Sequence, residues 1–178
     1  MAVDGIFITT ELEDELAQRI HDYQLEFDPK MANFLPPHIT LIGSSGAGPI
    51  PPDTPLAELK ARILPVTASL KPMTVKFGPP ERFVMREIVS LSLDPHGPIR
   101  ELHERLKTCG LPMPAAKYPF TPHCTLSLWP TLTQANVKKM LRIRESDPFV
   151  VSTLCVYHTR DLLKPKLLFR AALGEPAQ

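Results

Sequence analysis

The sequence predicts one domain of mixed helices and strands that is built by internal duplication. Two observations support this: PPHITLIG (36–43) and TPHCTLSL (121–128) share the pattern Pro-His-x-Thr-Leu, and each half of the chain repeats the order strand, helix, motif strand, helix, strand. A chain of 178 residues is long enough for one domain with a substantial core. Duplicated units normally assemble about a pseudo-two-fold axis, so we expect the two motif strands to meet at a shared groove.

The first half opens with a strand and a helix. IFITT at 6–10 is rich in β-branched and aromatic residues, which favours a strand. Apolar residues then recur at helical spacing, at Leu12, Leu16, Ile20 and Tyr23. Thr10 and Glu13 have the spacing of a capping box, so the helix is expected to begin there.

The first motif strand is followed by a loop, a helix and a strand. Residues 43–55 are dense in glycine and proline and can only form a loop. A helix is predicted from about Leu56, and we expect Pro65 to end or kink it because proline lacks the amide hydrogen that a helix interior uses. The segment MTVKF at 73–77 then predicts a strand.

The second half repeats this order. A strand is predicted at 88–93, and Pro98 suits the first position of the next helix, which should stop at Gly110. After the second motif strand come a helix within 134–144 and two strands at 149–157 and 166–173. The two motifs therefore occupy the same place in each half.

Composition and charge narrow the function classes. The formal net charge is +1 and the basic residues form no long run, which argues against a protein that binds long duplex nucleic acid. Three cysteines without a CxxC pair indicate a reducing compartment, neither a disulfide framework nor a zinc site. The opening residues lack the pattern of a signal peptide and no segment is long and apolar enough to span a bilayer. We therefore expect a cytoplasmic protein.

The alternation of side chains along a strand defines the candidate site. His38 and Thr40 share one strand face, as do His123, Thr125 and Ser127, while the apolar residues between them point to the other face. The apolar faces are expected to form the core. The polar faces then remain for a site, and finding the same pattern twice favours a site over a surface accident.

Two histidines and two threonines suggest a definite chemistry. One imidazole can be neutral while the other is protonated near neutral pH, which supplies a general base and a general acid. Threonine hydroxyls can donate hydrogen bonds to phosphoryl oxygens as charge develops there. A metal site needs three or four ligands, and neither motif brings a second histidine or a carboxylate at ligand spacing. We therefore expect no metal and no cofactor.

The two PH-x-TL motifs, their separation and the repeated layout resemble the two-histidine (2H) phosphoesterase superfamily, which includes 2′-5′ RNA ligase-like proteins and cyclic phosphodiesterases. The resemblance covers Ile6 to Leu173. It implies an α+β fold of two lobes, about 1–80 and 81–178, with mainly antiparallel sheets around a central cleft and helices outside. It leaves open whether strands are exchanged between the lobes.

The resemblance also implies metal-independent phosphodiester chemistry. It makes His38 and His123 the general base and acid, in an order left open, and Thr40 and Thr125 ligands of the phosphate. The leading hypothesis is hydrolysis of a 2′,3′-cyclic or related cyclic nucleotide phosphate. The alternatives are an RNA-end enzyme acting on 2′-5′ linkages or terminal cyclic phosphates, and a nucleotide-binding module without turnover. The substrate is thus a small cyclic nucleotide or an RNA terminus, and the protein is expected to be a monomer without an obligatory protein partner.

Several further residues are weaker candidates. Phe83 could stack on a base and Arg86 could meet a phosphate, although core packing and a surface charge explain them as well. Tyr157 or His158, in the segment VYHTR, could touch substrate, and Ser127 shares the motif face. The remaining polar and aromatic positions are expected to be structural or solvated: Trp129 at the rim or in the core, His21, His96 and His103 at the surface, and Lys138, Lys139, Arg142 and Arg144 on a helix face that could also guide RNA.

Overall fold

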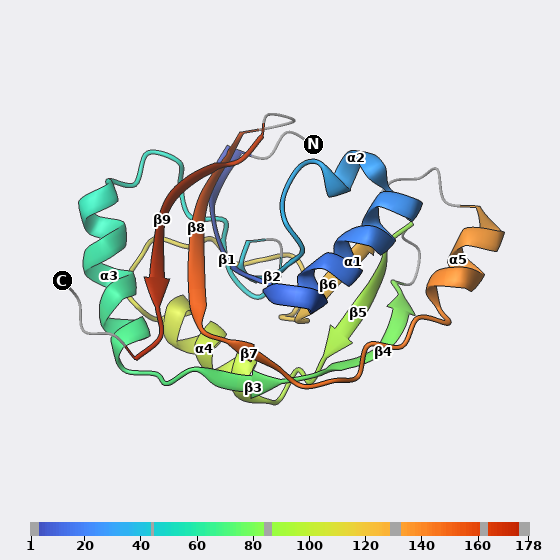
Figure 1. The fold of residues 1–178 in the computed structure, drawn as a ribbon. Coiled ribbons are helices and arrows are strands. Elements are labelled where there is room, and N and C mark those ends of the chain that lie inside the picture. Colours follow the sequence, from blue (N-terminus) through green and yellow to red (C-terminus); the bar gives the residue numbers. More distant parts are fainter. Residues whose placement is uncertain (1–3, 44, 84–86, 129–132, 161–163, 175–178) are drawn as a thin grey trace.

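The computed structural model describes residues 4–43, 45–83, 87–128, 133–160 and 164–174. Figure 1 shows how the elements are arranged in space. In chain order they are β1 (Asp4–Glu11), α1 (Asp14–Phe27), α2 (Pro29–Ala32), β2 (His38–Ile42), α3 (Leu56–Ala68), β3 (Met73–Val75), β4 (Phe77–Arg82), β5 (Val89–Leu93), α4 (Pro98–Lys107), β6 (His123–Ser127), α5 (Gln134–Met140), β7 (Phe149–Val151), β8 (Thr153–Arg160) and β9 (Lys166–Ala172).

The motif strands β2 and β6 are neighbours in the middle of the main sheet. Within the described residues this sheet has the order β4-β5-β6-β2-β1-β8-β9, and β3 pairs with β7 in a second, two-stranded sheet. The pairings between these strands are antiparallel. The predicted α+β fold with mainly antiparallel sheet is therefore confirmed.

Beyond the β3–β7 pair, each half of the chain continues into the part of the main sheet that the other half forms. The strand after β3, which is β4, pairs with β5 of the second half, and the strand after β7, which is β8, pairs with β1 of the first half. Each half thus contributes a strand that lies beside the first strand of the other half. The division into lobes near residue 80 stays a prediction, and that position lies within β4.

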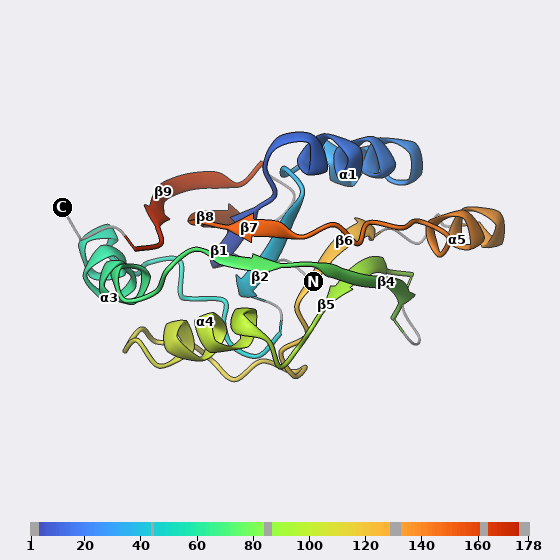
Figure 2. The ribbon, with the colours of Figure 1, turned by 60° about the horizontal axis from the view of Figure 1, so that its bottom comes forward.

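The two motif strands bury their side chains in the same order. In both, the first and third residues are partly exposed and the second, fourth and fifth are buried. Ile39, Leu41, Cys124 and Leu126 are fully buried in the core. Helices α1 and α4 lie on opposite sides of the sheet (Figure 2), and α4 buries Ile99, Leu102, His103 and Leu106. The predicted alternation of apolar and polar faces is therefore present in both copies.

Helix boundaries differ from the prediction at two positions. Strand β1 extends to Glu11, so Thr10 lies in a strand, and the cap residue Glu13 makes no side-chain capping bond; the predicted capping box is wrong. Pro65 does not end its helix, which continues to Ala68. The extra turn forms because the Ser69 amide donates to the Pro65 carbonyl at 3.2 Å, and because Thr67 is buried.

Two predicted strands are divided in the structure. The strand expected at 73–77 ends at Val75, and a separate strand, β4, follows with Pro79 and Pro80 inside it. Such prolines are tolerated because β4 is an edge strand, where a missing amide hydrogen breaks no ladder. The strand expected at 149–157 is interrupted at Ser152, because β7 pairs with β3 while β8 joins the main sheet.

The loop at 43–55 is attached to the sheet at several places. Ile50 and Ile6 exchange two backbone hydrogen bonds of 2.8 and 3.0 Å. Further along, the Gly46 amide donates to the Tyr118 carbonyl at 2.9 Å. The loop therefore holds the segment before the second motif in place, which a composition dominated by glycine and proline does not reveal.

His103 is buried, so the expectation that it lies at the surface is wrong. Its ring stacks on Phe120 with 3.8 Å between the centroids, and its Nδ1–H donates to the Leu41 carbonyl at 2.7 Å. This bond connects α4 to the back of the first motif strand. His96 is exposed as expected, while His21 is partly buried.

We expect Gly46→Ala to destabilise the protein more than Gly110→Ala. Both glycines have a positive φ, +73° and +92°, which costs a residue with a Cβ about 1–2 kcal/mol. A Cβ at Gly46 would also lie 2.4 Å from the His103 ring and 2.8 Å from Phe120, whereas one at Gly110 meets only the flexible Arg62 at 3.4 Å. Urea unfolding of both variants measures the difference, and equal losses would show that the ring stack yields freely.

Candidate active site

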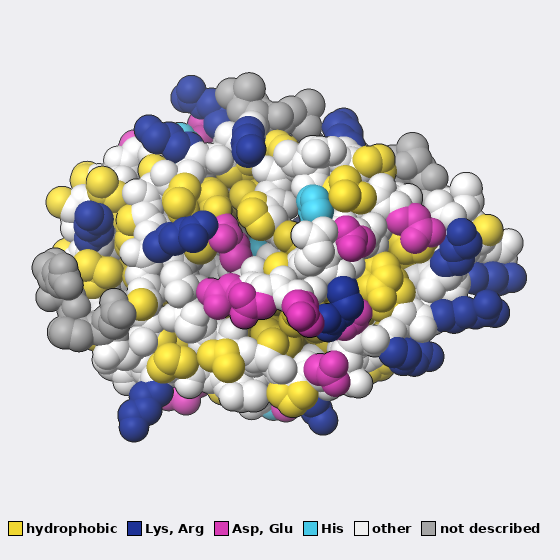
Figure 3. All heavy atoms as spheres, viewed as in Figure 1, with side chains coloured by type: hydrophobic (Ala, Val, Ile, Leu, Met, Phe, Trp, Pro, Cys, Tyr) yellow, Lys and Arg dark blue, Asp and Glu magenta, His cyan; other side chains and the backbone are white. Residues whose placement is uncertain are grey.

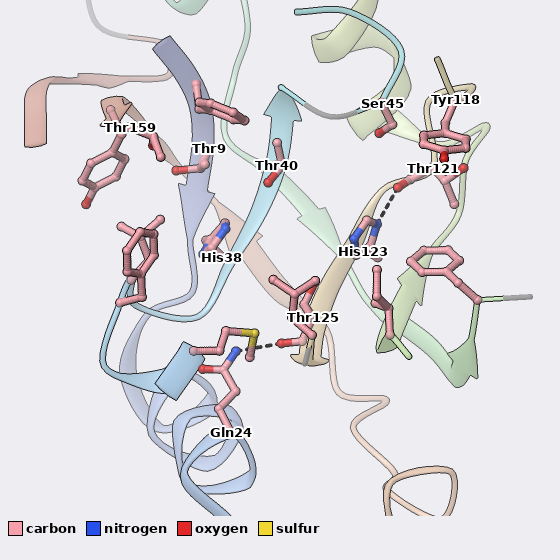
Figure 4. Close-up of a pocket in the computed structure, with 18 of the residues that line it drawn as sticks. Thr9, Gln24, His38, Thr40, Ser45, Tyr118, Thr121, His123, Thr125 and Thr159 are labelled. Atoms are coloured by element: carbon pink, nitrogen blue, oxygen red, sulfur yellow. Dashed lines mark hydrogen bonds between the residues drawn. The ribbon is translucent and has the colours of Figure 1, made fainter. Parts of the chain in front are cut away.

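The register of β2 and β6 pairs the two motifs crosswise. Ile39 is the partner of Cys124 in this antiparallel pair, so the neighbouring positions place His38 opposite Thr125 and Thr40 opposite His123. All four side chains lie on the same face, and Figure 4 shows them around one cavity. Each histidine therefore lies beside the threonine of the other motif, and the chain folds the two distant segments into one site.

The two imidazole rings are held in the same way. Nδ1–H of His38 donates to the Pro36 carbonyl, and Nδ1–H of His123 donates to the Thr121 carbonyl, both at 2.7 Å. A carbonyl oxygen only accepts, so each Nδ1 carries its proton in the neutral ring. Nε2 is then the nitrogen that can take up or release a proton, and the backbone two residues upstream fixes this tautomer in both copies.

Burial lowers the pKa of both histidines. For His38 burial is the largest cause, the Pro36 carbonyl opposes it, the neighbouring His123 lowers the pKa further and Glu11 raises it. For His123 burial again lowers the pKa and the Thr121 carbonyl opposes it. Both rings therefore release a proton more readily than an exposed histidine, and charge on one ring discourages charge on the other.

Helices α1 and α2 close one end of the site. Gln24 of α1 is buried, lines the cavity and donates from Nε2 to the Thr125 carbonyl at 2.8 Å. Asp28 accepts from the Met31 amide at 3.0 Å, which caps α2, and from the Leu128 amide at 2.8 Å. These bonds attach both helices to the second motif strand and bring Met31 to the cavity wall.

The cavity has a volume of about 720 Å³ and an aromatic wall. Five aromatic side chains line it in addition to the histidines: Phe7, Phe34, Phe83, Tyr118 and Tyr157. The edge of one of them, Phe83, meets the ring of His123 at 82° with 5.0 Å between the centroids. Among the described lining residues there is no lysine or arginine. The four motif side chains thus lie in a largely apolar pocket, together with hydroxyl and amide side chains from other elements.

The weaker sequence candidates are placed differently by the structure. Phe83 and Tyr157 line the cavity, while Ser127 does not, because it is buried and its hydroxyl points to Asp28 at 3.4 Å. His158 also lies outside the lining and bonds to Asp4 at 2.9 Å. Arg86 and Trp129 lie outside the described residues.

Several lining residues were not found from the sequence. Gln24 reads as an ordinary helix residue, and Phe34, Ser45 and Tyr118 come from connecting segments whose course depends on the fold. Only Thr121 carries a local indication, because it immediately precedes the second motif. The four motif residues are thus brought together, but most of the wall is recruited from positions without a pattern.

The described residues contain neither a cluster of metal ligands nor a membrane-spanning helix. No group of three or more histidine, cysteine, aspartate or glutamate side chains is placed to hold a metal ion. In the same part of the chain, no helix has the length and apolar character needed to cross a bilayer.

Comparison with solved structures establishes the fold over the whole chain. The protein TT0787 of Thermus thermophilus matches with a TM-score of 0.69 at 17% identity, covering 98% of both chains. E. coli LigT complexed with 3′-AMP matches with a TM-score of 0.62 at 17% identity, covering 98% of this chain and 100% of LigT. A structure described as a phosphoesterase gives 0.59 at 16% identity, covering 97% of this chain and 100% of the other.

Sequence comparison establishes the family. A search of curated proteins gave no match. The model of the family described as the 2′-5′ RNA ligase superfamily matches residues 12–162, a span that contains both motif strands and most of the fold. This chain therefore belongs to the 2′-5′ RNA ligase superfamily of two-histidine phosphoesterases.

Proposed function

We propose that the protein hydrolyses a 2′,3′-cyclic or related cyclic nucleotide phosphate without a metal ion, using His38 and His123 as the acid–base pair. The observation that carries this proposal is the crosswise pairing of the two motifs, with both Nδ1 atoms held by backbone carbonyls. This leaves two Nε2 atoms on one cavity face, each beside a threonine hydroxyl. In-line phosphoryl transfer needs one proton acceptor and one proton donor on opposite sides of the phosphorus.

The reaction follows from these positions. One neutral imidazole removes a proton from water as the water oxygen attacks the phosphorus. The bond from phosphorus to one ribose oxygen breaks, and the other imidazole, protonated at the start, gives its proton to that oxygen. Thr40 and Thr125 donate hydrogen bonds to the non-bridging oxygens, where negative charge collects. The product is an open nucleotide monophosphate, and exchange with solvent restores the two histidines.

The character of the cavity supports a small substrate. Its volume of about 720 Å³ lies within the range of about 300–1,000 Å³ that small-molecule pockets usually occupy. The aromatic wall can stack on a nucleobase, and a cyclic phosphodiester carries a single negative charge. One of the ligands with which E. coli LigT was crystallised, 3′-AMP, is a phosphomonoester of the kind that opening of a 2′,3′-cyclic phosphate releases.

Action on RNA ends is the second candidate. The family itself is described by 2′-5′ RNA ligation, and Figure 3 shows lysine and arginine side chains gathered over the end of the molecule that carries α5. The exposed basic residues of this segment are Lys138, Lys139, Arg142 and Arg144. Such a surface would attract a phosphate backbone that extends beyond the cavity.

Rates on two substrate classes in EDTA distinguish the candidates. We expect the 2′,3′-cyclic mononucleotides to be hydrolysed faster than 2′-5′-linked or cyclic-phosphate-ended oligonucleotides, and the rate to depend little on salt. Lys138→Gln/Arg142→Gln should leave mononucleotide turnover unchanged. Faster oligonucleotide turnover that falls steeply with salt and in this variant would favour the RNA-end enzyme. Tight nucleotide binding without product from either class would indicate a binding module.

The pH profile should reflect the depressed histidine pKa values. In the active form the two histidines together carry one proton. The population of this form falls at low pH, where the base is also protonated, and at high pH, where the acid loses its proton. Because burial lowers both pKa values, we expect the maximum of kcat/KM below about pH 6.5, the ordinary value for histidine. The maximum of kcat should lie at higher pH, since the bound phosphate anion favours protonated imidazole. A kcat/KM that still rises above pH 7 would contradict this expectation.

A further inference from the structure

The two halves of the active site differ in the residue beside each histidine. In the register of the sheet, Glu11 of β1 is the partner of His38, and Ser92 of β5 is the partner of His123. These positions correspond in the two halves, because β1 flanks the first motif strand as β5 flanks the second. Directly paired residues of antiparallel strands project from the same face with Cβ atoms about 4.5–5.5 Å apart. One histidine therefore has a carboxyl neighbour and the other a hydroxyl.

The side chain of Glu11 is held at this position by two donors. The Tyr157 hydroxyl donates to Oε1, and the Arg170 guanidinium donates to Oε2 at 2.9 Å. Only 15% of the Glu11 side chain is exposed. By contrast, the Ser92 hydroxyl donates away from the site, to the Pro79 carbonyl at 3.1 Å. The two related halves of the site thus differ electrostatically, because only His38 has a carboxylate on the neighbouring strand.

We propose that Glu11 is a positioning residue that retains the catalytic proton on His38, so that His38 is the general acid and His123 the general base. This assignment rests on the proposed hydrolysis of a cyclic phosphodiester. In that reaction His123 Nε2 takes the proton of the attacking water as its oxygen bonds to phosphorus. His38 Nε2 gives its proton to the ribose oxygen as the bond from phosphorus to that oxygen breaks. The number of protons on the pair is unchanged.

The other ionisable groups near His38 make the proposal more specific. His123 on β6 opposes charge on His38. On β8, burial raises the pKa of the Tyr157 hydroxyl and raises that of the Cys155 thiol to about 12, so both are uncharged at neutral pH. Arg170 on β9 is positively charged and pairs with Glu11, so it offsets part of the effect that the Glu11 carboxylate has on His38. Removing Glu11 and removing Arg170 should therefore shift the His38 titration in opposite directions.

NMR titration of the histidine Cε1–H groups tests the proposal without requiring turnover. We expect His38 to hold its proton to a higher pH than His123. In Glu11→Gln, where Tyr157 can still donate to the side chain, the His38 midpoint should fall by about half a pH unit, the scale of one largely screened charge on a neighbouring strand. It should rise in Arg170→Gln and stay constant in Ser92→Ala, the matched control at the equivalent position.

Kinetics supply the second measurement. The alkaline limb of kcat/KM reports the acid in the free enzyme, so Glu11→Gln should move that limb to lower pH and leave the acid limb in place. A merely structural role would lower activity at every pH and leave both limbs unmoved. The assignment is overturned if His123 holds its proton to the higher pH, or if the His38 midpoint is the same with glutamine at position 11. If the titrations shift as expected but no cyclic phosphodiester gives product, the result would instead count against the hydrolysis itself.

Discussion

His38→Ala and His123→Ala are each expected to lower kcat on a 2′,3′-cyclic nucleotide by about 10²–10⁴-fold, the usual contribution of a positioned acid or base. Each variant removes an Nε2 that faces the cavity and leaves the other histidine without its partner. The double variant should be scarcely worse than either single one, because the two groups act in the same step. Steady-state rates of the purified proteins, measured in EDTA, give these ratios.

His96→Ala is the matched control for this experiment. His96 is exposed in the turn before α4 and does not line the cavity, so its loss should change kcat less than about threefold, within the range of ordinary surface substitutions. Thermal unfolding of the three variants checks that the fold is intact. Near-normal turnover in either motif variant would show that its histidine is not part of the chemistry.

Thr40→Val and Thr125→Val should each lower kcat by about 10²-fold, the lower end of the effect of losing one donor to developing phosphoryl charge. Valine keeps the shape and branching of threonine and removes only the hydroxyl, so the fold should persist. Because each threonine lies opposite the histidine of the other motif, the two variants should be similar. The measurement is kcat and KM on the same cyclic nucleotide.

Two comparisons distinguish hydrogen-bond donation by the threonine hydroxyl from packing of its methyl group. Thr159→Val alters a hydroxyl that also lines the cavity but lies on β8, away from the motif strands, and should have little effect on kcat. Thr40→Ser keeps a hydroxyl and should restore most of the activity lost in Thr40→Val. If serine is as poor as valine, the methyl group rather than the hydroxyl matters, and the role as a phosphate ligand is wrong.

The motif strands were predictable because their pattern is local. Alternation places His38 and Thr40 on one face and Ile39 and Leu41 on the other, and the same rule holds for the second copy. The structure shows identical orders of buried and partly exposed residues in both strands. The duplication also predicted that the two polar faces meet, since equivalent elements of a repeated unit normally lie about a common axis.

The predictions that were wrong failed because of interactions between segments that are distant in the sequence. Alternation alone would place Ser127 beside Thr125, but Asp28 at the end of α1 covers the end of β6 and binds the Ser127 hydroxyl. His103 carries no sequence feature that distinguishes it from a surface histidine, yet a stack on Phe120 and a bond to Leu41 bury it. Tertiary contacts of this kind override local expectation and cannot be deduced from spacing.

The electrostatic asymmetry of the site was equally hidden. Glu11 reads as the end of a strand or the start of a helix, and nothing local connects it with His38. Only the sheet register brings them together, and only the packing of β8 and β9 supplies Tyr157 and Arg170 as its donors. The proposed order of acid and base, which the two nearly identical motifs leave open, thus rests on strands far away in the chain.

Hydrolysis of the four 2′,3′-cyclic mononucleotides in ¹⁸O-labelled water containing EDTA tests the proposed function most directly. Mass spectrometry of the products should show one ¹⁸O atom in the phosphate of an open nucleotide monophosphate, and none of this product with His38→Ala or His123→Ala. That result would demonstrate attack of water on phosphorus without a metal ion and with both histidines required. Absence of labelled product from all four nucleotides, or turnover that EDTA abolishes, would contradict the proposed function.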